Sequence, residues 1–257
     1  MSVSINLKGK KAIVFGIANE KSIAYAIAHM LDKEGVKIAV AYQPRVEALA
    51  LNAIRDFKNA VPIPCDVVEP ELMESFFKKI SSDFGEIDFI IHSIAFAKRE
   101  HLQGKFYDVS KRGFEVAEEV SAYSLIEITR RALPMMNKNS SIIALTYLGS
   151  ERVVPNYNIM GIAKASLQGC IRYLAYDLGE KNIRVNGISA GPIPTLAATA
   201  IKDFYEMLLN FTSKAPLKRT ITAEEVADTA LFLLSDLSSG ITGQVIYVDA
   251  GYSIMGD

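Results

Sequence analysis

The sequence has little cysteine, little histidine and almost no net charge, and each shortage excludes a class of function. Its 257 residues include two cysteines, Cys65 and Cys170, which lie far apart and form no CxxC pair. Two reduced thiols in a cytoplasmic protein are therefore favoured over a disulfide or a metal site. The three histidines are scattered, without a second histidine or a carboxylate at ligand spacing on one helical face, so no metal is predicted.

The formal net charge is -1, which removes the usual electrostatic argument for nucleic acid or an anionic membrane as the main partner. The first residues lack the apolar core of a signal peptide, and the longest apolar runs are too short to span a bilayer. No repeat or low-complexity linker divides the chain, and 50% of its residues are hydrophobic. The sequence predicts one cytoplasmic domain over residues 1–257.

Short β-branched runs alternate with long helical patterns. The predicted strands are 10–16, 36–42, 61–67, 87–93, 141–147, 183–189 and 244–250. Runs this apolar on both faces are typical of a parallel sheet covered by helices. The alternation predicts an α/β fold, a single doubly wound Rossmann-type domain with a seven-stranded parallel sheet and helices on both faces. Ligands bind such sheets beyond the carboxyl ends of the strands.

The loop after the first strand has a single glycine, Gly16, so the G-x-G-x-x-G fingerprint of dinucleotide folds is not met. A small residue is nevertheless needed there for the backbone to turn under a pyrophosphate. Ser22, at the start of the next helix, has a hydroxyl that could cap the helix or meet a phosphate. From the serine alone, capping is the favoured role.

The second strand leads into Gln43, where NAD sites usually carry an acidic residue and NADP sites a basic one. Gln43 can still hydrogen-bond a ribose, while Arg45 could attract a 2′-phosphate or be a solvated charge. NADH is favoured, with NADPH as the alternative. Asp66 lies at the end of the third predicted strand, where it could accept a bond from an adenine amino group or begin a turn.

The fifth predicted strand ends at Tyr147, and a loop then leads into a predicted helix that contains Tyr157 and Lys164. Seven helical residues turn through about 700°, so Tyr157 and Lys164 project within roughly 20° of one another. In the common carbonyl-reducing short-chain dehydrogenases the lysine follows the tyrosine by four residues. Here the residue four before Lys164 is Met160. The carbonyl-orienting serine of those enzymes would fall at Tyr147. The chain therefore lacks both the acid and the serine that ordinary carbonyl reduction uses.

These motifs resemble those of the bacterial enoyl-acyl-carrier-protein reductases, a divergent branch of the short-chain dehydrogenase/reductase superfamily. The resemblance runs nearly end to end and includes GIANEKSIAYAIA, HSIAFA, TYLG, the Tyr-x6-Lys of NYNIMGIAK, RVNGISAGPI and GQVIYVDAGY. It implies reduction of the C2=C3 double bond of trans-2-enoyl-acyl-carrier-protein thioesters by hydride transfer from NADH, the last reductive step of type II fatty acid elongation.

The resemblance also implies the site residues. Tyr157 would stabilise the enolate oxygen, Lys164 would hold the nicotinamide ribose, Tyr147 would line the pocket and Ala97 would touch substrate. The implied cofactor-binding residues are Gly16, Ser22, Ile23, Gln43, Asp66, Val67, Ile94, Lys164, Ile193, Pro194, Thr195, Leu196 and Ala197. The enoyl-acyl-carrier protein would be the partner, and the family is typically homotetrameric.

One departure from the family concerns the cover over the substrate. Pro194 stands where the family usually has an arginine, which removes a cation and a backbone N–H. From Leu196 onward, Ile201, Phe204, Leu208 and Phe211 recur at helical spacing. This pattern fits an ordinary core-covering helix, whereas the resemblance implies a substrate-covering helical segment at about 195–213.

Two other functions remain open. A short-chain ketoreductase is disfavoured by Met160. A non-catalytic nucleotide sensor on the same fold would normally carry a damaged tyrosine or lysine, and neither is damaged here.

Overall fold

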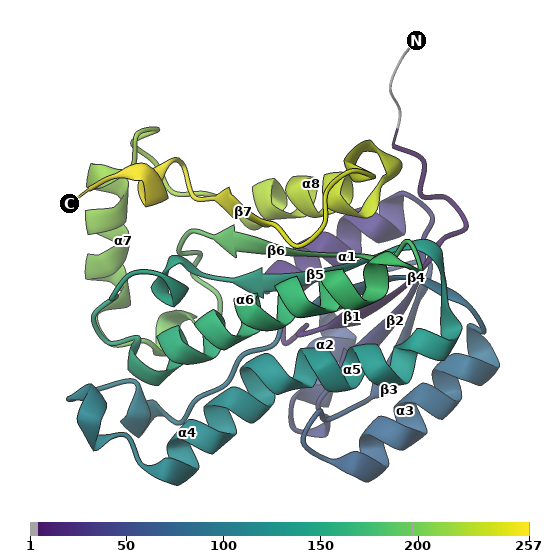
Figure 1. Ribbon diagram of the computed structural model, residues 1–257, viewed down its shortest axis with the longest axis horizontal. Helices are drawn as coiled ribbons and strands as arrows, with labels where there is room; N and C mark the ends of the chain where they lie inside the picture. Colours follow the sequence, from purple (N-terminus) through teal and green to yellow (C-terminus); the bar gives the residue numbers. More distant parts are fainter. Residues whose placement is uncertain (1–4, 197, 257) are drawn as a thin grey trace.

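The computed structural model describes residues 5–196 and 198–256. Seven parallel strands form one sheet in the order β3-β2-β1-β4-β5-β6-β7, which confirms the predicted topology (Figure 1). The strands are β1 (Lys11–Phe15), β2 (Lys37–Tyr42), β3 (Ala60–Pro64), β4 (Ile87–His92), β5 (Met136–Thr146), β6 (Arg184–Ala190) and β7 (Val245–Val248).

The helices lie on both faces of this sheet, as predicted. The α-helices are α1 (Ile23–Lys33), α2 (Glu47–Ala53), α3 (Pro70–Asp83), α4 (Lys111–Glu118), α5 (Ser124–Ala132), α6 (Asn158–Gly179), α7 (Phe204–Lys214) and α8 (Ala223–Leu234). A five-residue π-helical turn, Glu119–Tyr123, joins α4 to α5. No helix in the described residues is long and apolar enough to cross a membrane.

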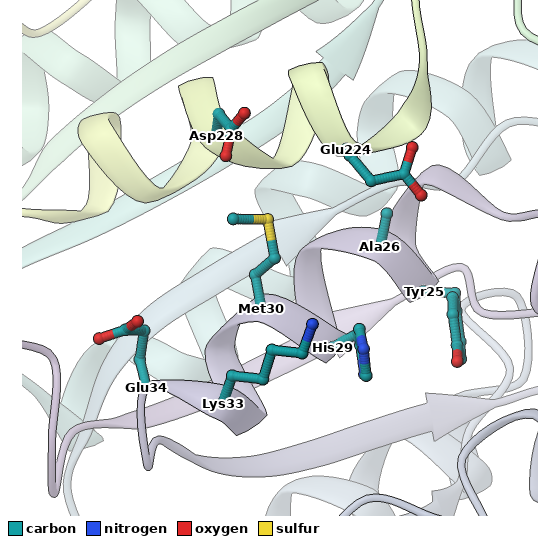
Figure 2. Close-up of a pocket in the computed structure, with 8 residues that line it drawn as sticks. All are labelled: Tyr25, Ala26, His29, Met30, Lys33, Glu34, Glu224 and Asp228. Atoms are coloured by element: carbon teal, nitrogen blue, oxygen red, sulfur yellow. The ribbon is translucent and has the colours of Figure 1, made fainter.

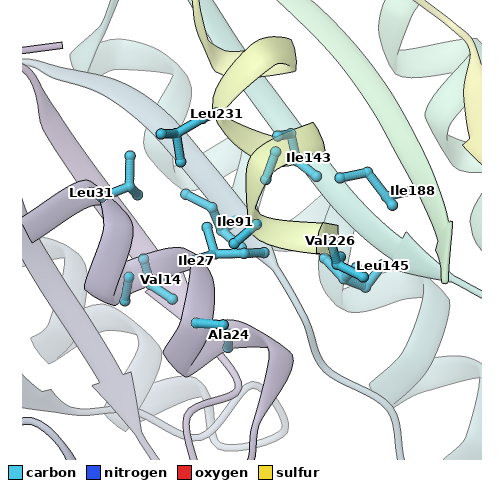
Figure 3. Close-up of a cluster of buried hydrophobic side chains, with 14 of the residues drawn as sticks. Val14, Ala24, Ile27, Leu31, Ile91, Ile143, Leu145, Ile188, Val226 and Leu231 are labelled. Carbon is cyan, nitrogen blue, oxygen red and sulfur yellow. The ribbon is translucent and has the colours of Figure 1, made fainter. Parts of the chain in front are cut away.

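Alternate residues of the central strands enter two separate cores. Val14 of β1 packs with Ile27 of α1 and Val226 of α8 on one face, and Figure 3 shows this cluster. Ile13, one residue earlier, packs on the other face among the side chains of α3, α5 and α6. Strands buried on both faces explain the nearly continuous apolar runs of the sequence.

The parallel register brings the carboxyl ends of the strands to one edge. Phe15 at the end of β1 pairs with His92 at the end of β4, and His92 pairs with Ala144 of β5. The loops after β1, β2, β3, β4, β5 and β6 therefore leave the sheet on the side where the sequence predicts the ligand.

Candidate active site

Gly16 lets two of these loops touch. Its φ is +106°, and a Cβ at this position would lie 2.1 Å from the carbonyl oxygen of Ser93 in the loop after β4. Both the backbone conformation and the close approach require glycine. The first loop thus provides the tight backbone turn that a dinucleotide fold needs, even without the complete glycine fingerprint.

Ser22 precedes α1 but does not cap it with its side chain. Its Oγ instead accepts hydrogen bonds from the backbone N–H groups of Ala18 at 3.1 Å and Asn19 at 3.2 Å. The prediction of a capping hydroxyl is therefore wrong, because the loop before the helix uses that oxygen. The buried serine shapes the loop between β1 and α1, and Ile23 follows it as the first helical residue.

Gln43 and Asp66 meet at the carboxyl ends of β2 and β3. The Gln43 Nε2 donates to Asp66 Oδ2 at 3.0 Å, and the Arg45 Nε donates to Gln43 Oε1 at 2.9 Å. The Arg45 guanidinium also lies over the ring of Phe96, 5.5 Å from its centroid. Residues predicted separately from two strand ends thus form one polar group. It offers both donors and acceptors of the kind that a ribose or an adenine requires.

Tyr147 and Tyr157 lie together at the end of β5. Their ring centroids are 5.1 Å apart and the ring planes meet at 72°, an edge-to-face arrangement. Burial raises the pKa of Tyr147 to about 12, and burial raises the pKa of Tyr157 further. Both phenols consequently keep their protons at neutral pH and can donate hydrogen bonds.

Lys164 is buried on α6, with only 6% of its surface exposed. Its Nζ donates to the carbonyl oxygen of Leu145 at 2.6 Å. Burial lowers the pKa of Lys164 to about 8, so in most molecules this side chain is charged at neutral pH. His92 lies fully buried nearby, where burial and the charge of Lys164 lower its pKa to about 3. The cation of this site is therefore Lys164, beside a neutral imidazole.

The placement of Tyr157 within a helix is wrong by one residue, since α6 begins at Asn158 and Tyr157 is the residue before it. The prediction also missed two glycines: Gly149 makes room for the ring, and Gly161 makes room for the backbone of Gly149. A Cβ on Gly149 would lie 2.5 Å from Tyr157 Cδ1, and a Cβ on Gly161 would lie 2.7 Å from the carbonyl oxygen of Gly149. The glycines in TYLG and IMGIAK were visible in the sequence, but their contacts depend on packing.

A small apolar cluster surrounds the tyrosines. Ala97, from the loop after β4, and Ile201, from the segment before α7, pack with Tyr147 against buried Tyr157 and Met160. Two of the remaining predicted residues, Val67 and Ile94, pack at the border of the core that contains α3 and α6. The structure therefore brings Ala97 to the tyrosines, while Val67 and Ile94 follow the ends of β3 and β4.

The segment after β6 turns at Pro194. The Thr195 N–H donates to the carbonyl oxygen of Ile193 at 2.7 Å, a three-residue turn that the fixed φ of proline favours. Thr195 Oγ1 then accepts from the N–H of Ala198, and Leu196 is largely exposed. Ala197 lies outside the described residues. The departure at Pro194 thus produces a tight turn just before the predicted cover.

The cover is shorter than predicted as a helix. A single 3-10 turn, Ala198–Ala200, is followed by α7, which begins at Phe204 after Asp203 with a φ of +60°. Phe204 and Phe211 face inward, and Leu208 is half-buried. The hydroxyl of Tyr147 contacts the sulfur of Met207 at 3.9 Å. Helix α7 is therefore linked directly to the tyrosine pair.

A hollow elsewhere shares no lining residue with this site. It has a volume of about 240 Å³ and lies between α1 and α8, with His29 and Met30 on one side and Glu224 and Asp228 on the other (Figure 2). The residues that the sequence predicts for the site lie at the carboxyl edge of the sheet and not around this hollow. Buried phenol donors, an ammonium group and polar side chains at the strand ends can together bind a dinucleotide and stabilise an oxyanion beside it.

The known proteins that resemble this chain belong to one family. The family model described as Enoyl-(Acyl carrier protein) reductase matches residues 16–253. The enoyl-acyl-carrier-protein reductase (NADH) of Nostoc sp. is 47% identical over 256 residues, covering 98% of this chain and 99% of the relative. The corresponding protein of Bacillus cereus is 46% identical, covering 97% and 99%.

Two solved structures are similar throughout. The Bacillus cereus enoyl-acyl-carrier-protein reductase with NADP+ and indole naphthyridinone has a TM-score of 0.95 and 46% identity, covering 99% of this chain and 100% of that one. The Anaplasma phagocytophilum reductase with NAD has a TM-score of 0.94 and 38% identity, covering 100% and 98%. This chain belongs to the enoyl-acyl-carrier-protein reductase family.

Proposed function

We propose that the protein reduces the C2=C3 double bond of trans-2-enoyl-acyl-carrier-protein thioesters, with NADH as the hydride donor. The observation that carries this proposal is the pairing of Tyr157, the residue just before α6, with Lys164 on α6: both are buried, and both keep their protons at neutral pH. The relatives with this activity in their names match nearly the whole chain at 46 to 47% identity.

Tyr157 acts as a hydrogen-bond donor to the thioester oxygen. Hydride arriving at C3 leaves an enolate, whose negative charge collects on that oxygen. A donor already in position stabilises this charge more strongly in the transition state than in the ground state. The raised pKa of Tyr157 supports this role, because the phenol keeps its proton while it donates. Tyr147 supports the ring of Tyr157 edge to face and lines the same pocket.

Lys164 holds the ribose next to the nicotinamide. Its ammonium has three donors, and the carbonyl oxygen of Leu145 accepts from one of them. The remaining donors suit a pair of ribose hydroxyls, and the positive charge favours an enolate nearby. The lysine therefore acts mainly in cofactor binding and orientation.

The carboxyl edge of the sheet fits the rest of NADH. Gly16 gives the backbone approach that a pyrophosphate needs, and Gln43 with Asp66 supplies polar groups for the adenosine end. NADH supplies the hydride when bound. We assign to the cofactor the predicted set Gly16, Ser22, Ile23, Gln43, Asp66, Val67, Ile94, Lys164, Ile193, Pro194, Thr195 and Leu196. We also include Ala197, and we assign Ala97 to the substrate.

Residues 195–213 act as the cover over the acyl chain, within a single domain of residues 1–257. The buried side of α7 and its contact with Tyr147 support this role, since an apolar cover excludes water from the hydride step. The protein works in the cytoplasm, which agrees with its two free cysteines.

The protein is a homotetramer. Exposed apolar side chains on the outer surfaces of α4 to α6 support assembly, since large apolar patches of monomers are few. They are Phe114, Tyr123, Ile126, Ile162, Tyr173 and Tyr176. Sedimentation of the purified protein tests this: a tetramer is expected, and a monomer at micromolar concentration contradicts it.

A paired assay tests the activity. Purified protein should oxidise NADH with crotonyl thioester and should not do so with acetoacetyl thioester. The reverse preference would favour a ketoreductase. Binding of NADH without reduction of either substrate would favour a nucleotide sensor. Running both substrates with NADPH in parallel measures the cofactor preference.

A further inference from the structure

The π-helical turn between α4 and α5 holds the loop that follows β4. Ser121 lies in this turn and is fully buried. Its Oγ accepts from the backbone N–H of Phe96 at 3.0 Å and donates to the carbonyl oxygen of the same residue at 3.3 Å. One side chain thus satisfies both backbone groups of a residue that lies beyond the end of the strand.

Ser124, three residues later, holds the end of β4 itself. Its Oγ donates to the carbonyl oxygen of Val120 at 2.6 Å, so its single proton is already used. The contact with His92 Nε2 at 2.7 Å must therefore use a proton from the imidazole. His92 is consequently a neutral ring with its proton on Nε2, which agrees with a pKa lowered to about 3.

The π geometry is part of this attachment. The Ser124 N–H donates to the carbonyl oxygen of Glu119, five residues earlier, instead of to that of Val120. Ser124 then offers its hydroxyl to the Val120 carbonyl. Single π turns inside helices are rare, and those that occur are often found at functional sites. The two serines therefore attach to β4 and its loop at two points, His92 and Phe96.

The loop so attached carries residues of the site. Ser93 touches Gly16, Ala97 packs in the cluster around the tyrosines, and the ring of Phe96 lies beneath Arg45. We propose that Ser121 and Ser124 are positioning residues, which fix the loop 93–97 in the conformation that receives the nicotinamide end of the cofactor and the substrate. This rests on the proposed function, and it adds two residues that contact neither ligand.

Replacing Ser121 tests the proposal. Ser121→Ala leaves the loop to be ordered by the ligand, so we expect the KM for NADH to rise about tenfold while kcat changes less than about threefold. A tenfold change corresponds to about 1.4 kcal/mol, which is the order of the effect of losing one buried hydrogen bond. Ser121→Thr keeps the hydroxyl and should restore the KM to within about threefold of the wild type.

Ser141→Ala is the matched control. Ser141 is also fully buried and donates from its Oγ to one backbone carbonyl, that of Leu233, at 2.9 Å, but it lies on β5 away from the loop. It should lower the melting temperature without changing the KM for NADH. An equal rise in KM in both variants would overturn the proposal, as would an unchanged KM in Ser121→Ala.

Amide hydrogen exchange provides a readout that needs no activity, and its first part uses the wild type alone. In the wild type the Phe96 amide should be protected, and in Ser121→Ala or Ser124→Ala it should exchange at least tenfold faster than in the wild type. An unprotected Phe96 amide in the wild type would overturn the proposal. Failure of the wild type to reduce an enoyl thioester would instead contradict the proposed function, and the exchange result would still decide the role of the serines.

Discussion

The ammonium of Lys164 donates to the carbonyl oxygen of Leu145 at 2.6 Å, one residue before the end of β5 and two before Tyr147. This bond attaches the interior of α6 to the strand that delivers the first tyrosine. The lysine is therefore held in place before any cofactor arrives, and the rings of Tyr147 and Tyr157 already meet edge to face. Preorganisation of this kind is what oxyanion stabilisation requires.

Tyr157→Phe should lower kcat by about 10²–10³-fold, since it removes one preorganised donor from the developing enolate. The Kd for NADH should stay within about twofold, because the ring and its packing against Gly149 remain. Steady-state kinetics and NADH fluorescence titration measure the two quantities. Tyr147→Phe is the matched control and should lower kcat much less; an equal loss would reassign the oxyanion donor.

Lys164→Ala should mainly weaken cofactor binding. Hydrogen bonds from a charged group are worth about 1.5–3 kcal/mol, so the Kd for NADH should rise about 10- to 100-fold. The same fluorescence titration measures this change. An unchanged Kd together with a lower kcat would contradict the assignment of this lysine to the ribose.

The affinity for NADH should depend on pH through Lys164. Its pKa in the folded protein is about 8, below the usual 10.5, so the ammonium is lost as pH rises through about 8. The pKa of His92 lies near 3 and that of Tyr147 near 12, so neither titrates in this range. Wild-type affinity should therefore fall between pH 7 and pH 9.5, whereas Lys164→Met should bind weakly without that step.

The same shift has the opposite effect on stability. Between pH 8 and pH 10.5 the unfolded chain binds the proton of Lys164 more tightly than the folded one does. The free energy of unfolding contributed by this group therefore rises with pH across that window. Denaturant unfolding of the wild type and Lys164→Met at pH 7 and pH 9.5 checks the sign: the free energy of unfolding of the wild type, minus that of the variant, should be larger at pH 9.5 than at pH 7.

Gly149→Ala should displace the ring of Tyr157. The new Cβ would lie 2.5 Å from Tyr157 Cδ1, so the ring or the loop must move. Because a misplaced catalytic group is costly, kcat should fall by at least about tenfold. Gly179→Ala is the control, since nothing lies within 4 Å of its added Cβ, and its kcat should equal that of the wild type.

Met207→Ala should loosen the contact between α7 and Tyr147. We expect the KM for the enoyl thioester to rise by a factor of about 3–10, in line with the loss of a half-buried apolar side chain. Met207→Leu keeps the volume and removes the sulfur, so it should behave like the wild type if shielding from water is the role of the cover. A large effect of Met207→Leu would mean that the sulfur itself matters.

Much of the sheet could be predicted from the sequence, because strands buried on both faces leave long β-branched runs. Val14 and Ile13 face opposite cores, yet both are apolar for the same reason. The convergence of the strand ends follows from the parallel topology, which is why the sequence predicts Gln43 and Asp66 at one edge, where the structure shows them hydrogen-bonded.

The features that sequence reasoning missed depend on tertiary contacts. The hydroxyl of Ser22 turns back to the loop, and the helix α7 begins only at Phe204 because Asp203 adopts a positive φ. Nothing in the letters VSAYS distinguishes a π turn from ordinary helix, since Ser121 gains its role from Phe96 of a distant strand loop. Propensity cannot anticipate such contacts.

A crystal structure with NAD+ and an enoyl thioester analogue bound tests the central claim most directly. The account predicts that the Tyr157 hydroxyl lies within hydrogen-bond distance of the thioester oxygen and that Lys164 Nζ contacts the nicotinamide ribose hydroxyls. A structure with the phenol turned away from the thioester, or with the lysine clear of the ribose, would contradict it.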